Sequence, residues 1–132
     1  QPLYQNTDFM VTTQETACEK NKKLLRLTIT YKSLQNIDQF YSAQIKLKQD
    51  GQIVYTAYHL VGYAVYPTLM WLSGDAITEV YEMPLPRRQK EGEYTLEISF
   101  AHSPLIPNEY GYTSIFANKN APDVKITNLQ FK

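Results

Sequence analysis

Apolar and polar side chains alternate with a period of two along most of the chain, and this is the period of β-strands. The clearest runs are 25–31 and 94–100, in which every second residue is apolar and the residues between are polar or charged. Both runs are rich in the β-branched and aromatic residues that suit a half-buried strand. No stretch of ten residues follows the 3.6-residue period of a helix, so we expect the chain to fold almost wholly as strands.

The same period predicts further strands, which are separated by turn residues. They are 41–48, a strand that begins at about Gln52, 76–83, 124–131 and, from a weaker pattern, 9–13. Asp50-Gly51 stands between two of them and predicts a tight hairpin, because Asp-Gly readily adopts the positive φ angles of such a turn. Pro84 and Pro86 are expected to end the strand 76–83, since proline cannot donate to a sheet ladder.

Two segments, 61–74 and 103–122, lack the alternation and contain glycine or proline. We interpret them as long loops, the first with room for one helical turn. Strands without intervening helices cannot form a parallel βαβ sheet. The sequence therefore predicts one all-β domain, 1–132, folded as a two-sheet antiparallel sandwich of the immunoglobulin-like kind with about seven to nine strands.

Charge and hydropathy exclude several partner classes. The 13 basic and 13 acidic side chains cancel, whereas a nucleic-acid binder needs a basic surplus or stripe to neutralise phosphates. We therefore expect no nucleic-acid partner. No run approaches the roughly 18 apolar residues of a membrane span. Cys18 is the only cysteine, so no disulfide can form within the chain.

The residue types that perform catalysis or bind metals do not cluster in the sequence. His59 and His102 are far apart and lack metal-ligand spacing, so we expect a structural or surface role for each. The acids of the strands, Glu79, Glu82, Glu93 and Glu97, are interpreted as a solvated sheet face. We predict no metal, no cofactor and no enzymatic activity. An enzyme would require one of the histidines to meet an acid in a pocket.

Aromatic residues are the unusual feature of the composition, with 11 tyrosines, five phenylalanines and one tryptophan. A tyrosine ring combines a flat apolar face with a hydrogen-bonding tip, which suits sugars and protein interfaces. Several aromatic residues fall in the two long loops. We take as candidate ligand-binding residues Tyr63, Tyr66, Trp71, Tyr110 and Tyr112. In the alternative interpretation, Tyr66 and Trp71 pin the first loop onto the core.

Six motifs follow one another along residues 24–100 in an order that resembles a known family. They are Leu25-Arg26-Leu27-Thr28-Ile29-Thr30-Tyr31, Gln44-Ile45-Lys46-Leu47-Lys48-Gln49-Asp50-Gly51-Gln52-Ile53-Val54, Tyr66-Pro67-Thr68, Trp71-Leu72-Ser73-Gly74-Asp75-Ala76-Ile77, Tyr81-Glu82-Met83-Pro84-Leu85-Pro86 and Glu91-Gly92-Glu93-Tyr94-Thr95-Leu96-Glu97-Ile98. The order and spacing resemble the C-terminal extracytoplasmic β-sandwich domain of bacterial membrane glycosyltransferases of the mannosyltransferase-like class, and related uncharacterised envelope proteins. Ser73 departs from this pattern, because the family usually has proline there.

The resemblance implies an extracytoplasmic location, in the periplasm, at the cell surface or secreted. It also implies a non-catalytic accessory or binding domain whose partner is a glycan or another envelope component. The transferase activity does not carry over, because none of its active-site positions is present. The chain is either the accessory domain of a membrane-bound parent or a free-standing relative. The alternative function is a structural or assembly protein that docks a partner chain, or associates with itself, through an edge strand such as 124–131.

Overall fold

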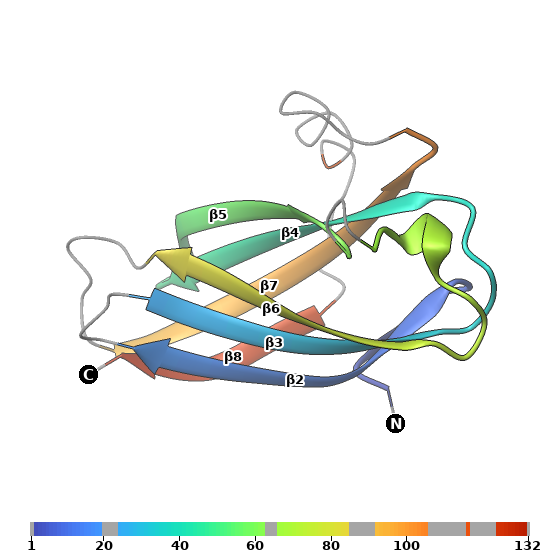
Figure 1. Ribbon diagram of the computed structural model, residues 1–132. Helices are drawn as coiled ribbons and strands as arrows, with labels where there is room; N and C mark the ends of the chain where they lie inside the picture. Colours follow the sequence, from blue (N-terminus) through green and yellow to red (C-terminus); the bar gives the residue numbers. More distant parts are fainter. Residues whose placement is uncertain are drawn as a thin grey trace.

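The computed structural model describes residues 2–19, 24–62, 66–84, 92–105, 116 and 124–131, and these residues form a sandwich of two antiparallel sheets (Figure 1). The strands are β1 (Tyr4–Gln5), β2 (Phe9–Glu19), β3 (Leu24–Ser33), β4 (Phe40–Gln49), β5 (Gln52–Leu60), β6 (Ala76–Pro84), β7 (Gly92–Ser103) and β8 (Val124–Phe131). One 3₁₀ turn, η2 (Thr68–Met70), lies between β5 and β6. It confirms the helical turn expected in the first long loop.

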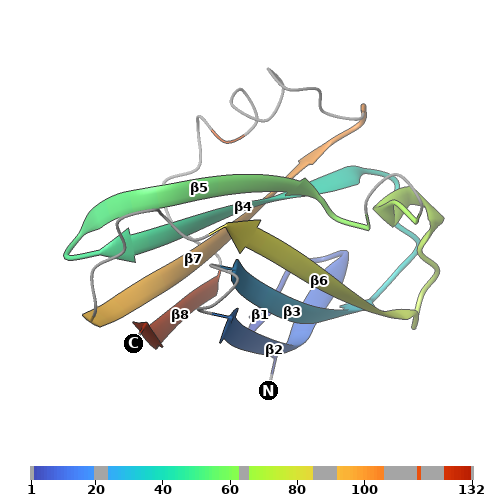
Figure 2. The ribbon, with the colours of Figure 1, turned by 60° about the vertical axis from the view of Figure 1, so that its left-hand side comes forward.

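The first sheet has the strand order β1-β2-β3-β6, and the second has the order β5-β4-β7-β8 (Figure 2). Every pairing in the described part of the chain is antiparallel. From β2 onward, the division of the strands between the two sheets is that of an immunoglobulin-like sandwich. The predicted fold class is therefore confirmed.

Strand β2 is longer than the sequence predicted, because it continues past residue 13 to Glu19. The β2–β3 register shifts between Val11 and Thr13, which marks a bulge in the strand. Before the bulge, Phe9 and Val11 are buried; from residue 12 to residue 17 no side chain is buried, so no apolar alternation reveals the strand. Strand β1 is only two residues long and was not predicted.

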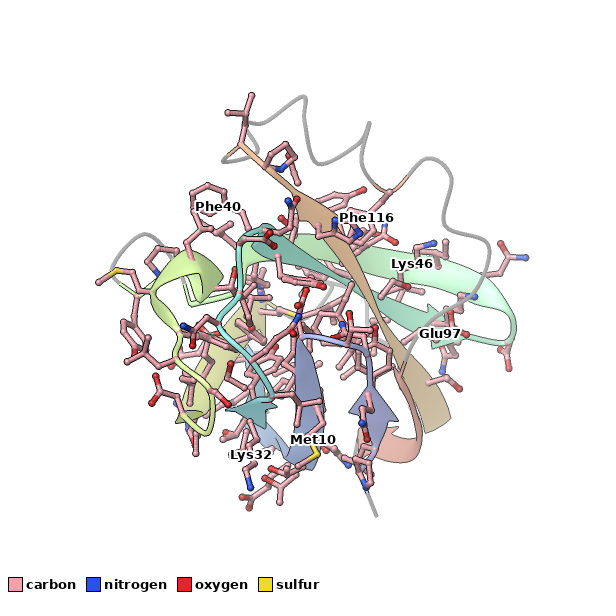
Figure 3. The ribbon with its side chains drawn as sticks, turned by 90° about the vertical axis from the view of Figure 1, so that its right-hand side faces the viewer. Met10, Lys32, Phe40, Lys46, Glu97 and Phe116 are labelled. Atoms are coloured by element: carbon pink, nitrogen blue, oxygen red, sulfur yellow. The ribbon has the colours of Figure 1, made fainter. Side chains whose placement is uncertain are left out.

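Strands β4 and β5 form the predicted hairpin at Asp50-Gly51. Asp50 has a φ of 53° and Gly51 a φ of 77°, as a tight two-residue turn requires. Farther along, the β4–β5 register shifts, so that Leu47 pairs with Tyr55 and the next pair is Lys48 with Ile53. The skipped residue, Val54, is a β-bulge in β5. Figure 3 views the molecule from the end where β4 begins at Phe40.

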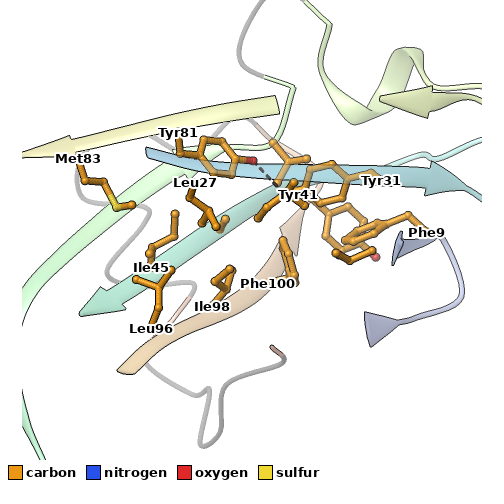
Figure 4. Close-up of a cluster of buried hydrophobic side chains, with 14 of the residues drawn as sticks. Phe9, Leu27, Tyr31, Tyr41, Ile45, Tyr81, Met83, Leu96, Ile98 and Phe100 are labelled. Carbon is orange, nitrogen blue, oxygen red and sulfur yellow. Dashed lines mark hydrogen bonds between the residues drawn. The ribbon is translucent and has the colours of Figure 1, made fainter. Parts of the chain in front are cut away.

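The core lies between the two sheets and is unusually aromatic at the end where β4 begins (Figure 4). The Phe9 ring packs edge-on against Tyr31, Tyr41 and Phe100, with centroids 5.4, 4.9 and 5.3 Å away. Such pairs contribute about 0.5–1.5 kcal/mol each beyond the area that they bury. Aliphatic residues such as Leu27 fill the rest of the core.

One buried carboxylate, Asp8, supports this aromatic end. Its two oxygens accept hydrogen bonds from the Tyr41 hydroxyl and from the Gln35 amide Nε2, both at 2.6 Å. The Asn6 side chain accepts the backbone N–H groups of Asp8 and Phe9, each at 2.8 Å, and so closes the turn between β1 and β2. Burial and the bond to Asp8 raise the pKa of Tyr41 far above its ordinary value.

Candidate binding site at the loop end of the sandwich

The chain crosses from the second sheet to the first in the loop 61–75, at one end of the sandwich (Figure 1). Gly62 starts the crossing with a φ of 81°, a conformation that glycine adopts without strain. A Cβ at this position would lie 2.0 Å from the carbonyl oxygen of Tyr66, so only glycine fits. The Tyr66 amide donates to the Gly62 carbonyl at 3.1 Å. This bond and the close approach of the two residues fix Tyr66 next to Gly62.

Trp71 fastens this loop to the core. Its indole is fully buried, with 0% of its surface exposed, and its ring lies 5.6 Å from that of Tyr31. The indole Nε1–H donates to the Tyr66 carbonyl at 2.9 Å, which satisfies the one polar atom of the side chain. A ring in this position cannot stack on a ligand at the surface. Trp71 is thus removed from the candidate ligand-binding residues, and the alternative that it pins the loop is correct.

Thr68 and Ser73 tie the same loop to the neighbouring segment 34–41. The buried Thr68 hydroxyl donates to the Gln39 carbonyl and accepts from the Tyr41 amide at 3.2 Å. Ser73 donates its hydroxyl to the Leu34 carbonyl at 3.2 Å and its amide to Asn36 Oδ1 at 3.1 Å. These four bonds join two segments that are more than 25 residues apart in sequence.

Asp75 closes the loop just before β6. Its Oδ2 accepts the Leu72 amide and the Tyr66 hydroxyl, both at 2.9 Å. The Leu72 amide, together with the Tyr66 hydroxyl, lowers the pKa of Asp75, and the same contact with Asp75 raises the pKa of Tyr66. The Tyr66 ring is therefore held at the surface by its hydroxyl tip.

The outcome of this bonding is an exposed apolar surface, which we name the loop-end patch. It consists of Tyr66, Leu69, Met70 and Leu72, whose exposed fractions range from 37 to 59%. Thr68 and Trp71 occupy the inward positions of the same segment, so the other side chains must point outward. Four exposed apolar residues within seven positions form a cluster of the kind that marks interaction sites.

The sequence identified only part of this surface. Of the predicted ligand-binding residues, Tyr66 belongs to the loop-end patch and Trp71 lies beneath it. Tyr63, Tyr110 and Tyr112 lie outside the described residues. Sequence reasoning missed Leu69, Met70 and Leu72, because aliphatic residues in a chain of this size are ordinarily assigned to the core. The available signal was their concentration around a predicted helical turn in a loop.

A second group of polar side chains lies inside the sandwich, next to the start of the same loop. Glu79 on β6 accepts the Tyr81 hydroxyl and the Gly62 amide on its Oε1 atom, both at 2.8 Å. The Tyr31 and Tyr81 hydroxyls are 2.9 Å apart. The His59 ring, on β5, stacks on Tyr81 with centroids separated by 4.6 Å. This cluster links both sheets.

Glu79 is buried, with 7% of its surface exposed, so the prediction that it lies on a solvated face was wrong. Burial raises the pKa of Glu79, although its two hydrogen bonds act in the opposite direction. Burial likewise raises the pKa of Tyr81 and lowers that of His59. The half-buried His59 ring therefore stacks on the same tyrosine whose hydroxyl donates to Glu79.

In the described ranges, no three His, Cys, Asp or Glu residues come together as metal ligands would. No helix there has the length and apolar character needed to cross a membrane.

Comparison with known proteins supports the fold and assigns no family. No family model and no curated protein matches the sequence. The structure of β-glucosidase 3B from Thermotoga neapolitana in complex with glucose matches 92% of this chain with a TM-score of 0.52 and 15% identity. The same enzyme in complex with glycerol matches with a TM-score of 0.51 and 15% identity, also over 92% of this chain. This chain spans only 15% of the enzyme in each case.

Chicken MD-1 complexed with lipid IVa is similar over 99% of this chain and 96% of its own, at 11% identity. Its TM-score of 0.42 is too low to establish a shared fold.

Proposed function

We propose that this chain is a non-catalytic binding domain of an extracytoplasmic protein, and that it recognises another envelope protein through the loop-end patch. The observation that carries this proposal is the exposure of Tyr66, Leu69, Met70 and Leu72 on one tightly bonded loop. Apolar side chains that a small domain leaves in water at one place are better explained by a partner that covers them.

The rigidity of the loop supports recognition. Gly62, Trp71 and Asp75 fix its backbone from the inside, and Thr68 and Ser73 fix it to the neighbouring segment. A surface that is already ordered loses little conformational entropy on binding, so more of the contact energy appears as affinity. A strongly bonded loop with an apolar outer side is therefore a suitable docking surface.

The chemistry of the patch favours a protein partner over a glycan. Sugar recognition needs polar side chains beside an aromatic ring, and among the described residues several of those next to Tyr66 are engaged within the fold. Asp75 Oδ2 accepts two hydrogen bonds, Asn36 Oδ1 accepts one, and the Ser73 hydroxyl donates to Leu34. Three of the four exposed side chains are aliphatic. An apolar segment of a protein complements such a surface better than a sugar does.

Two observations support an accessory role, and the first of them also implies a location outside the cytoplasm. The six motifs along residues 24–100 resemble an extracytoplasmic accessory domain. In the β-glucosidase structures, a part of similar fold makes up 15% of an enzyme chain, which is a precedent for a sandwich of this kind attached to a larger protein. This is an analogy of fold, and the binding argument depends on the loop-end patch.

A random peptide library displayed on phage, selected on the immobilised domain, tests the proposal. We expect the recovered peptides to contain a cluster of apolar residues. Their binding should weaken about tenfold or more for Met70→Lys and for Leu72→Lys, since a lysine at the centre of an apolar interface is desolvated without a partner. Both positions are exposed, so neither change should lower the stability of the fold.

The matched control is Val80→Lys, which places the same charge on an exposed apolar residue of β6. It should leave peptide binding unchanged. A glycan array on the same sample separates the two partner classes. Glycan binding that Tyr66→Ala abolishes would overturn the protein assignment, and recovery of no peptide sensitive to the patch variants would overturn the proposal itself.

A further inference from the structure

The outer strands of the two sheets differ in how well they are protected against pairing with another chain. In the described part, β5 and β8 are the outer strands of the second sheet, and β1 and β6 are those of the first (Figures 1 and 2). An outer strand presents backbone N–H and C=O groups along one side, and proteins usually protect such an edge with charge, proline or shortness.

Three of these strands carry such protection. Strand β1 has two residues, β6 contains Glu79, Glu82 and Pro84, and β8 contains Lys125. Strand β5 runs Gln-Ile-Val-Tyr-Thr-Ala-Tyr-His-Leu, with no Asp, Glu, Lys, Arg, Pro or Gly over nine residues. Its exposed large apolar residues are Ile53, Val54 and Tyr58, with exposed fractions between 36 and 52%. Among the described residues, two features modify β5: the bulge at Val54, and the Phe116 ring, which packs on Tyr58 with centroids 5.8 Å apart.

We propose that β5 is a self-association edge, at which the β5 strand of a second copy pairs antiparallel across a two-fold axis to join two four-stranded sheets. A two-fold axis places each residue opposite a residue of the identical strand. A neutral strand meets itself without repulsion, whereas β6 would bring its own acidic residues together. A second copy is thus the partner that this uncharged sequence fits.

The pairing that we infer is centred on Thr56. Thr56 then lies opposite the same residue of the second copy, and Val54 lies opposite Tyr58. A β-branched residue facing an aromatic one is a favourable cross-strand pair. The bulge at Val54 twists the strand, and this limits the pairing to residues 54–58. Because the pairing is short, we expect the fraction of dimer to depend on the protein concentration.

Substitutions at Thr56 test this geometry by charge. We expect sedimentation velocity to show the mass of two chains for the unmodified protein at high concentration. Thr56→Lys and Thr56→Glu should each remain single chains, because like charges then face each other at the axis. An equimolar mixture of the two variants should regain the mass of two chains. Recovery in the mixture excludes misfolding as the cause of the loss.

A cross-link tests the register. In a Cys18→Ser background, Thr56→Cys should form a disulfide-linked dimer under mild oxidation, because opposing Cβ atoms in a sheet lie about 4.5–5.5 Å apart and small shifts allow an S–S bond. Val80→Cys, on the outer strand β6, is the matched control and should not cross-link. A single-chain mass at all concentrations, a dimer insensitive to both Thr56 charges, or a dimer that Thr56→Cys does not lock would each overturn the proposal.

Discussion

The hydroxyl of Tyr81 donates to Glu79 Oε1 at 2.8 Å, and these two residues of β6 join the interior of the sandwich to the loop that carries the loop-end patch. The same oxygen accepts the amide of Gly62, where the chain leaves the second sheet. One buried carboxylate therefore holds both sheets and the first residues of the crossing. This arrangement ties the placement of the patch to the core.

Removal of the Glu79 carboxyl should destabilise the protein through its two donors. In Glu79→Ala the Gly62 amide and the Tyr81 hydroxyl lose a buried acceptor, which we expect to cost about 2 kcal/mol. Glu79→Gln keeps an oxygen in the same place and should cost much less. Urea unfolding of both variants at pH 7 measures the difference. Equal losses would show that these hydrogen bonds do not carry the effect.

Gly62 and Gly74 form a matched pair for the crossing loop. Both have a positive φ, at 81° and 90°, but a Cβ on Gly62 would meet the Tyr66 carbonyl at 2.0 Å, whereas one on Gly74 would have nothing within 4 Å. Gly74→Ala should cost about 1 kcal/mol from backbone strain alone. Gly62→Ala should cost about 3 kcal/mol, because the loop must also move. Thermal unfolding of the two variants tests this order, and the reverse order would refute it.

The Tyr41–Asp8 pair should show how much stability is lost when a buried carboxylate loses a hydrogen-bond donor. Tyr41→Phe keeps the ring against Phe9 but removes the donor that lies 2.6 Å from Asp8 Oδ2. We expect a loss of about 2 kcal/mol, since hydrogen bonds to charged groups contribute about 1.5–3 kcal/mol. Tyr66→Phe, at an exposed hydroxyl bonded to Asp75, serves as the comparison and should cost less. Urea unfolding measures both losses, and similar values would contradict the role of burial.

The fold could be predicted from the sequence because its causes are local. Alternation along 25–31 and the Asp50-Gly51 turn act within a few residues, and both were confirmed. Strand β2 gave no such signal after its bulge, because residues 12–17 bury no side chain and therefore need no apolar alternation.

The site was harder to predict because distant residues decide which side chains are buried. Glu79 shares the period of Tyr81 and so faces inward, yet its polarity suggested an exposed position. Its partners Gly62 and Tyr81 become visible only when the two sheets are packed. In the same way, Thr68 and Trp71 take the inward positions of their segment, which leaves Met70 outside. A sequence pattern alone does not show which side chains of a segment will take the inward positions.

Glu79 and His59 should affect the pH dependence of the stability of the unmodified protein in opposite directions in mildly acidic solution. Burial raises the pKa of Glu79 above 4.5, so its contribution is fully present below pH 4.5 and declines as the pH rises through the folded-state pKa. Burial lowers the pKa of His59 below 6.5, so its contribution is fully present above pH 6.5 and declines as the pH falls. Between pH 4.5 and 6.5 the two effects therefore have opposite signs.

Single substitutions should separate the pH dependence of stability that each group contributes. In Glu79→Gln only His59 still titrates, so that variant should lose stability, relative to the unmodified protein, as the pH falls from 6.5 to 4.5. His59→Phe keeps a ring on Tyr81 and leaves Glu79 alone, so that variant should gain relative stability over the same interval. Any contact that phenylalanine loses shifts the whole profile without changing its slope. Free energies of urea unfolding at pH 4.5, 5.5, 6.5 and 7.5 measure these profiles for the unmodified protein, the two single variants and the double variant. Four parallel curves would show that neither group titrates as its burial requires.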